Sequence, residues 1–180
     1  NKRAVVLMGP PGIGKTSAAM MLAKSLKQKA YKVAFNSETK ISDLFGNLTI
    51  TSGNFNKANG QLYRAMKDGG FFVADEINLA EISVMESLTV ALEQSFGEEI
   101  NLPNSEKPIT VSEDFFFIGC QNSNTMYGRR HIPHNLRKKA VLLEYPFPKE
   151  TMDRIISNIF GEKQGSHKFT VIYVSPLVLK

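Results

Sequence analysis

A glycine-rich run near the start of the sequence has the spacing of a phosphate-binding loop. Residues 9–16 read GPPGIGKT, which satisfies the pattern G-x-x-x-x-G-K-[ST]. Glycines allow backbone N–H groups to converge on phosphate oxygens, Lys15 can neutralise β- and γ-phosphates, and the Thr16 hydroxyl can hold Mg²⁺. The predicted nucleotide-binding residues are Gly9, Pro10, Pro11, Gly12, Ile13, Gly14, Lys15, Thr16 and Ser17.

The residues on either side of this loop predict the elements that the motif requires. Ala4–Met8 is a continuous apolar run with the length of a buried strand. After Lys15, apolar residues recur at the spacing of a helix with one buried face, namely Ala19, Leu22, Ala23 and Leu26. A strand, a glycine loop and a helix therefore follow one another in the correct order. A chance glycine turn before a helix is the alternative, and this order disfavours it.

Two acidic residues end a second apolar strand. Gly69 and Gly70 break a predicted helix over Gln61–Lys67, and Phe71–Ala74 reads as a buried strand that ends at Asp75 and Glu76. We expect Asp75 to hold Mg²⁺ together with Thr16, and Glu76 to polarise the water that attacks the γ-phosphate. The alternative is a helix N-cap, since a helix with Val84, Leu88 and Ala91 on one face follows. A cap would explain only one of the two carboxylates.

A third apolar strand, Phe115–Cys120, runs into Gln121 and Asn122. The carboxyl ends of parallel strands form the ligand-binding edge of such a sheet, so we expect Asn122 to orient the water between Glu76 and the γ-phosphate. An asparagine after a strand is usually a turn residue. Its order in the chain, after the phosphate loop and the acidic strand, favours the catalytic role.

The composition is that of one globular domain. The chain has 180 residues, of which 42% are hydrophobic and 22% charged. It contains neither an apolar run of 18 residues nor a secretory leader pattern, so the sequence predicts no membrane association. The single cysteine, Cys120, excludes an internal disulfide and suits a reducing compartment. The net charge of +5 leaves open both a nucleic-acid partner and an ordinary phosphate-binding protein.

The sequence resembles the AAA+ ATPases of the midasin and dynein branch, and most of all midasin modules. Besides the phosphate loop, the resemblance is carried by SETKISDLFG (37–46), by residues 59–94 with their DEINLA run, and by residues 119–140. It implies a Walker A motif at Gly9–Thr16, a Walker B motif at Phe71–Glu76 and sensor 1 at Asn122. It also implies ATP and Mg²⁺ as cofactors, and a hexameric ring of modules within one polypeptide. Sensor 2 is not assigned.

One departure from the family pattern concerns the arginine finger. Family members end their fourth helix with a pattern like L-R-N-R-F, whose second arginine reaches the γ-phosphate of the neighbouring module. The same place here reads LRKKA (136–140), so the resemblance puts Lys139 at the finger position. Lysine lacks the planar fork of arginine. Either the neighbouring site hydrolyses slowly or Arg137 has taken this role.

Other polar residues have more ordinary interpretations. The densest basic stretch is expected to be a solvated face or a module interface, with RNA binding as the alternative; it comprises Arg129, Arg130, His131, His134, Arg137, Lys138 and Lys139. Zinc binding by Cys120, His131 and His134 is disfavoured, because no second cysteine completes a zinc pattern. Glu98–Ser112, with two prolines, reads as a hairpin or a loop.

The expected fold is a three-layer α/β P-loop core with a five-stranded parallel sheet. Residues 1–148 form the nucleotide-binding subdomain, and residues 149–180 begin a truncated helical lid, in which Phe169–Lys180 is strand-like without an assigned role. Since the chain opens almost on its phosphate loop, we expect one module of a longer protein. The five strands are expected near Ala4–Met8, Lys32–Asn36, Phe71–Asp75, Phe115–Gln121 and Ala140–Leu143.

The predicted function is Mg²⁺-dependent ATP hydrolysis that drives the remodelling of a macromolecular complex. The resemblance to midasin implies release of assembly factors from pre-60S ribosomal particles, with nuclear or nucleolar localisation, and otherwise a cytoplasmic one. One alternative is a nucleic-acid translocating restriction motor that uses GTP. Another is a dynein-like structural module that binds nucleotide with little turnover; Lys139 partly favours it, whereas Glu76 and Asn122 disfavour it.

Overall fold

A parallel five-stranded sheet forms the centre of the computed structural model. The structure describes residues 4–51, 54–93, 97–103, 105, 107–122 and 131–145; for residues 48–51 and 54–57 it describes the backbone only. The strand order is β2-β5-β8-β1-β9, and each neighbouring pair is parallel. The predicted sheet is therefore confirmed. Its strands are β1 (Ala4–Gly9), β2 (Ala30–Ala34), β5 (Gly70–Asp75), β8 (Phe115–Asn122) and β9 (Val141–Glu144).

All five strands differ from the predicted ranges by one or two residues: β1, β5 and β8 are each one residue longer, whereas β2 and β9 are shifted as a whole. β2 begins at Ala30 instead of Lys32, because its pairing with β5 starts at the Ala30–Phe71 register. β9 begins at Val141 instead of Ala140, because Ala140 still donates its backbone N–H to Leu136 at the end of a helix. Both shifts move the strand by one or two residues and leave the sheet unchanged.

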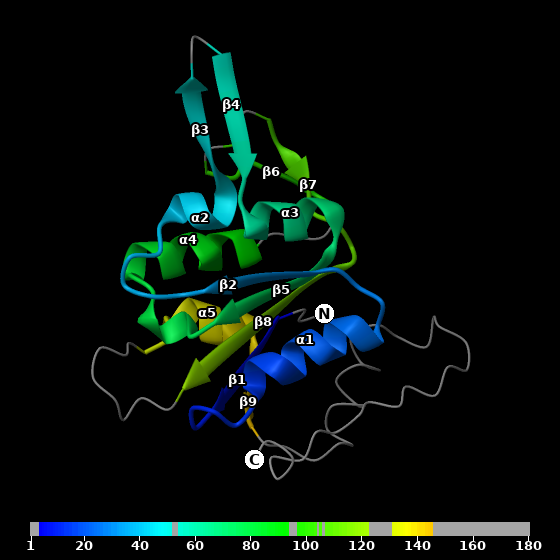
Figure 1. The fold of residues 1–180 in the computed structure, drawn as a ribbon, viewed down its shortest axis with the longest axis vertical. Helices are drawn as coiled ribbons and strands as arrows, with labels where there is room; N and C mark the ends of the chain where they lie inside the picture. Colours follow the sequence, from blue (N-terminus) through cyan, green and yellow to red (C-terminus); the bar gives the residue numbers. More distant parts are fainter. Residues whose placement is uncertain are drawn as a thin grey trace.

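Helices cover both faces of the sheet, as Figure 1 shows. α1 (Lys15–Ser25) lies alone on one face within the described part of the chain. The other face carries four helices and a short 3₁₀ turn, η1 (Ile77–Leu79). These helices are α2 (Ile41–Phe45), α3 (Gln61–Asp68), α4 (Ile82–Leu92) and α5 (His134–Lys139). The three-layer arrangement is thus confirmed for the described residues.

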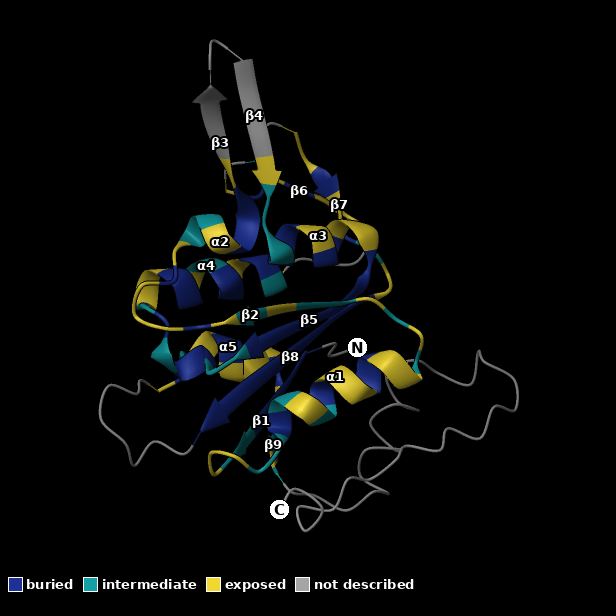
Figure 2. Cartoon of the chain, in the orientation of Figure 1, coloured by how far each residue is buried: buried dark blue, intermediate teal, exposed yellow. Residues whose placement is uncertain are grey.

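The strands bury alternate residues in two separate cores. In β5 and β8, Phe71 packs against Phe116 on the α1 side, with ring centroids 5.1 Å apart. Phe72 stacks on Phe117 on the opposite side, at 6.0 Å, beneath the larger group of helices. Both strands are therefore buried on both faces, which explains their continuous apolar runs (Figure 2). This burial fixes the register of the strand ends where the acidic and amide residues lie.

Two antiparallel hairpins extend from the face of the sheet that carries α2, α3, α4 and α5. β6 (Glu99–Ile100) pairs with β7 (Ile109–Thr110), which confirms the hairpin interpretation of residues 98–112. β3 (Gly46–Thr51) pairs with β4 (Asn54–Asn59) between α2 and α3, and projects from the body of the molecule (Figure 1). This second hairpin was not predicted. Its strands are rich in asparagine, a residue depleted in strands, so the pattern is weak.

Three sequence interpretations lie outside the described residues: the lid at 149–180, the strand-like segment 169–180 and the basic residues Arg129 and Arg130. Among the described helices, none is long and apolar enough to cross a membrane.

Candidate functional site

The predicted phosphate-loop, acidic and asparagine residues meet at one edge of the sheet, where β1, β5 and β8 end (Figure 1). The loop after β1 leads into α1, Asp75 is the last residue of β5, and Asn122 is the last of β8. These ends enclose a pocket of about 300 Å³. It is lined by Gly12, Gly14, Lys15, Thr16, Ser17, Asp75, Glu76, Cys120 and Asn122.

The phosphate loop needs its glycines for backbone geometry. Gly12 has φ 73° and Gly14 has φ 92°, both in the left-handed region that side chains rarely adopt. Gly14 is also the N-cap of α1, and its carbonyl accepts the N–H of Ala18 at 2.9 Å. The first turn of α1 therefore begins at the pocket, where helix N–H groups and the helix dipole favour an anion.

Lys15 is held at the centre of this pocket. Its side chain is only 6% exposed, and its ammonium donates to the carbonyls of Gly9 at 3.1 Å and Pro10 at 2.7 Å. It also donates to Oδ1 of Asn122 at 2.7 Å. A buried ammonium is costly without such partners, so this network places a fixed positive charge where phosphates would bind.

Thr16 and Asp75 form the predicted metal pair. The Thr16 hydroxyl donates to Asp75 Oδ1 at 2.6 Å, although the two residues come from different elements. The ligands that this pair offers are hard oxygen atoms, which Mg²⁺ prefers. The donor set of the pocket therefore fits Mg²⁺.

The helix N-cap explanation for Asp75 and Glu76 is wrong. Asp75 is engaged with Thr16 and with Lys32, whose ammonium lies 3.0 Å from Asp75 Oδ2. Glu76 precedes η1 but makes no side-chain capping bond there, and the N-cap of α4 is Glu81. Both carboxylates thus face the site instead of a helix end.

Asn122 joins the catalytic candidates to one another. Its Nδ2 donates to Glu76 Oε1, while its Oδ1 accepts from Lys15. One amide side chain therefore contacts both the phosphate-loop lysine and the predicted catalytic base. This arrangement excludes the simple turn role for Asn122, which ends a paired strand and is 5% exposed.

Glu76 adopts a backbone conformation that is rare for its residue type. Its φ is 53° and its ψ is 40°, in the left-handed helical region. Such conformations cost about 1–3 kcal/mol and persist where surrounding structure imposes them. Glu76 lies in the turn between β5 and η1, and its carboxylate accepts the hydrogen bond from Asn122 Nδ2.

Three further residues of the site were missed in the sequence. Asn78, which is fully buried, donates from Nδ2 to the backbone carbonyl of Asn122 at 3.4 Å and ties η1 to the end of β8. Lys32 pairs with Asp75, as described above. Cys120 lines the pocket beside Thr16, and burial raises the pKa of its thiol to about 12, so it stays protonated at neutral pH.

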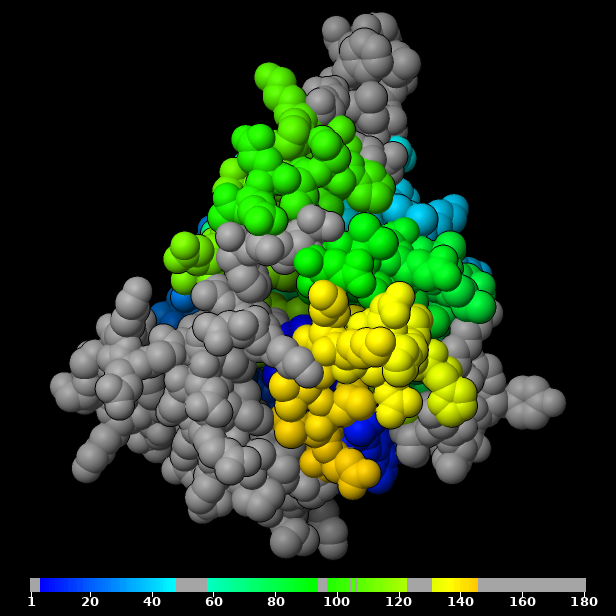
Figure 3. All heavy atoms as spheres, turned by 180° about the vertical axis from the view of Figure 1, so that it is seen from behind, coloured from blue at the N-terminus to red at the C-terminus, as the bar shows by residue number. Residues whose placement is uncertain are grey.

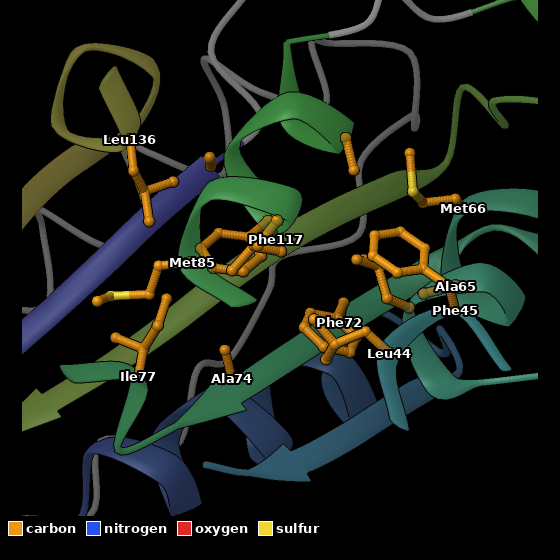
Figure 4. Packing of buried hydrophobic residues seen from close by; sticks show 14 of the residues in the cluster. Leu44, Phe45, Ala65, Met66, Phe72, Ala74, Ile77, Met85, Phe117 and Leu136 are labelled. Carbon is orange, nitrogen blue, oxygen red and sulfur yellow. The ribbon is translucent and has the colours of Figure 1, made fainter. Parts of the chain in front are cut away.

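The finger candidates lie elsewhere. Arg137 and Lys139 are exposed on α5, and neither lines the pocket of its own chain. Leu136, which is fully buried, anchors this helix, and α5 lies at the surface beside α4 (Figure 3). The site within one chain thus unites Lys15, Thr16, Asp75, Glu76 and Asn122 without either finger candidate.

The structure gives no support to zinc binding. Cys120 belongs to the apolar cluster under α1, whereas His131 and His134 are exposed residues near α5. No group of three His, Cys, Asp or Glu residues suited to a metal ion occurs in the described ranges.

Comparison with known proteins agrees with this geometry. Residues 4–140 match the AAA domain of the dynein-related subfamily. The chain is 28% identical to midasin of Dictyostelium discoideum over 93% of its length, and 26% identical to midasin of Giardia intestinalis over 89%. It spans only 3% of either midasin.

A solved structure is similar in fold. The crystal structure of a candidate ATPase from Cytophaga hutchinsonii superposes with a TM-score of 0.60 at 20% identity, and the match covers 94% of this chain and 48% of that one. At this identity the similarity concerns the fold alone. Together with the match over residues 4–140, these findings establish that the chain belongs to the AAA domain family, dynein-related subfamily.

Proposed function

We propose that this chain binds ATP with Mg²⁺ and hydrolyses it as one module of a ring-forming remodelling ATPase related to midasin. The observation that supports this most directly is the pair of hydrogen bonds that Asn122 makes with Lys15 and Glu76. A module that only binds nucleotide needs Lys15 but has no use for a carboxylate positioned by the same amide.

Each residue of the pocket has a distinct task in this proposal. Lys15 and the N–H groups at the start of α1 bind the phosphates. Thr16 and Asp75 would hold Mg²⁺, which supplies charge neutralisation at the β- and γ-phosphates. Glu76 accepts the proton of the attacking water, and Asn122 orients that water between the carboxylate and the γ-phosphate.

The similarity to midasin extends the proposal to a substrate. We propose that the parent protein releases assembly factors from pre-60S ribosomal particles, in the nucleus or nucleolus, with further modules of the same polypeptide as partners. The matched midasins are about thirty times longer than the aligned region, which leaves room for further modules.

Thermal protection tests the choice of nucleotide. At 100 times its Kd, Mg·ATP should stabilise the chain by about 2.7 kcal/mol, which corresponds to a rise in Tm of roughly 5–10 °C. GTP at the same concentration should give a clearly smaller rise. Scanning calorimetry with ATP, GTP and no nucleotide decides the matter. Equal or greater protection by GTP would favour the restriction-motor alternative, and no protection by either would exclude the nucleotide site.

The finger residue is tested at the neighbouring site. We propose that Lys139 acts on the adjacent module, since it is exposed and lies outside the pocket of its own chain. Losing a finger arginine costs about 10³–10⁵ in rate, so Lys139→Arg in the full-length protein should raise turnover at the adjacent site by about tenfold or more.

Arg137→Ala is the matched control on the same helix. Site-resolved ATP turnover should be unchanged by this variant if Lys139 is the finger. If Arg137→Ala abolishes turnover while Lys139→Arg and Lys139→Ala have no effect, Arg137 is the finger instead.

A further inference from the structure

Lys32 places a second positive charge at the metal pair. It pairs in register with Val73 of β5, and Val73 packs in the core under α1. Residues paired in parallel strands share a face, so Lys32 lies on the α1 side of the edge strand β2, as does Asp75 two residues after Val73. From there its ammonium lies 3.0 Å from Asp75 Oδ2.

The two oxygens of Asp75 are therefore divided between two partners. Oδ1 accepts the Thr16 hydroxyl at 2.6 Å, and Oδ2 contacts the Lys32 ammonium. A cation held by Thr16 and Asp75 would share this single carboxylate with Lys32. Two cations on one carboxylate repel one another, and each weakens the binding of the other.

We propose that Lys32 is a built-in counter-ion that lowers the affinity of this site for Mg²⁺ and makes metal binding depend on nucleotide. This inference rests on the proposed function. The charges of Lys15 and Lys32 balance those of Asp75 and Glu76, so the side chains alone give Mg²⁺ little net attraction. Nucleotide phosphates add negative charge, and Mg²⁺ then binds together with them.

The exposure of the Lys32 and Asp75 side chains determines how far Lys32 lowers the affinity for Mg²⁺. Lys32 is 43% exposed and Asp75 21%, so solvent screens the pair and the lysine can move away from an incoming cation. Exposed ion pairs of this kind alter equilibria by about two- to fivefold. Lys32 therefore tunes the affinity for the metal without preventing its binding.

Lys32→Met tests the proposal, with Lys29→Met as the matched control. Lys29 is an exposed lysine just before β2, so both variants remove one charge from the same part of the surface. Mn²⁺ serves as the probe, titrated by electron paramagnetic resonance into the chain saturated with ADP. Lys32→Met should lower the Kd for Mn²⁺ by about two- to fivefold. Lys29→Met and Lys32→Arg should keep the parent Kd, and the gain should shrink at high salt.

Two results would overturn the proposal. An unchanged or raised Kd for Mn²⁺ in Lys32→Met would mean that the ion pair is only structural. A loss of ADP affinity in EDTA in the same variant would mean that Lys32 is a phosphate ligand instead of a counter-ion to Asp75. If the parent chain itself fails to bind ADP, the proposed function fails, and that outcome is distinct from both.

Discussion

Lys15→Ala is expected to weaken ATP binding by at least about 100-fold. Hydrogen bonds to charged groups contribute about 1.5–3 kcal/mol each, and an ammonium that faces the β- and γ-phosphates makes more than one of them. In the structure, this ammonium is buried and fixed by the Gly9 and Pro10 carbonyls and by Asn122. Its three N–H donors all have partners here, so phosphate binding exchanges some of these hydrogen bonds for bonds to phosphate oxygens, and Lys15→Ala removes both those new bonds and the counter-charge.

Isothermal titration calorimetry with Mg·ATP measures this loss, and Lys24→Ala is its control. Lys24 is an exposed residue of the last turn of the same helix, so its replacement removes an equal charge away from the pocket. The Tm of both variants without nucleotide checks the fold, because Lys15→Ala also leaves Asn122 Oδ1 without its ammonium donor. An unchanged ATP affinity in a folded Lys15→Ala chain would refute the phosphate-loop assignment.

The sheet and most of the pocket could be predicted because both depend on strongly patterned strands. β5 and β8 are buried on both faces, so they appear in the sequence as unbroken apolar runs. Parallel strands bring their carboxyl ends to one edge, and the polar residues that follow each run must meet there. Asp75 and Asn122 are such residues, and their contacts with Thr16 and Lys15 confirm that juxtaposition.

The parts that could not be predicted depend on tertiary contacts that leave little trace in the sequence. Lys32 lies between Tyr31 and Val33 on an edge strand, and in the sequence it looks like any solvent-exposed lysine. Only the β2–β5 register shows that it lies beside Asp75. Asn78 resembles a turn residue, yet it is fully buried against the end of β8. The left-handed backbone of Glu76 could not be predicted from the sequence either, since glutamate has no preference for that region.

Two of these unpredicted features, Asn78 and the backbone of Glu76, help to fix the catalytic candidates in place. Asn78 holds the backbone of Asn122, the Asn122 amide holds the Glu76 carboxylate, and Glu76 itself lies in the strained turn between β5 and η1. The catalytic candidates are thus fixed by neighbours that the motif itself does not include. Precise positioning of this kind is what separates a catalytic carboxylate from one that merely follows a strand.

Glu76→Gln is expected to leave ATP affinity within about twofold while it lowers turnover by about 10²–10⁴, the usual contribution of a general base. The amide oxygen can still accept the hydrogen bond that Asn122 Nδ2 donates to Glu76 Oε1, so the pocket should keep its shape. The amide cannot accept a proton from water, however, so only the rate of hydrolysis should fall.

The comparison requires the full-length protein, because a site without a neighbouring finger turns over slowly whatever its own carboxylates do. Glu86→Gln, an exposed change on α4, controls for the loss of one charge, and Asp75→Asn should instead weaken the Mg²⁺ dependence of binding. Calorimetry measures affinity, and single-turnover phosphate release measures the chemical step. Parent-like phosphate release at this site by both Glu76→Gln and Asp75→Asn would show that neither carboxylate has its assigned role. A large loss of ATP affinity in Glu76→Gln would instead make Glu76 a binding residue that supports the strained turn.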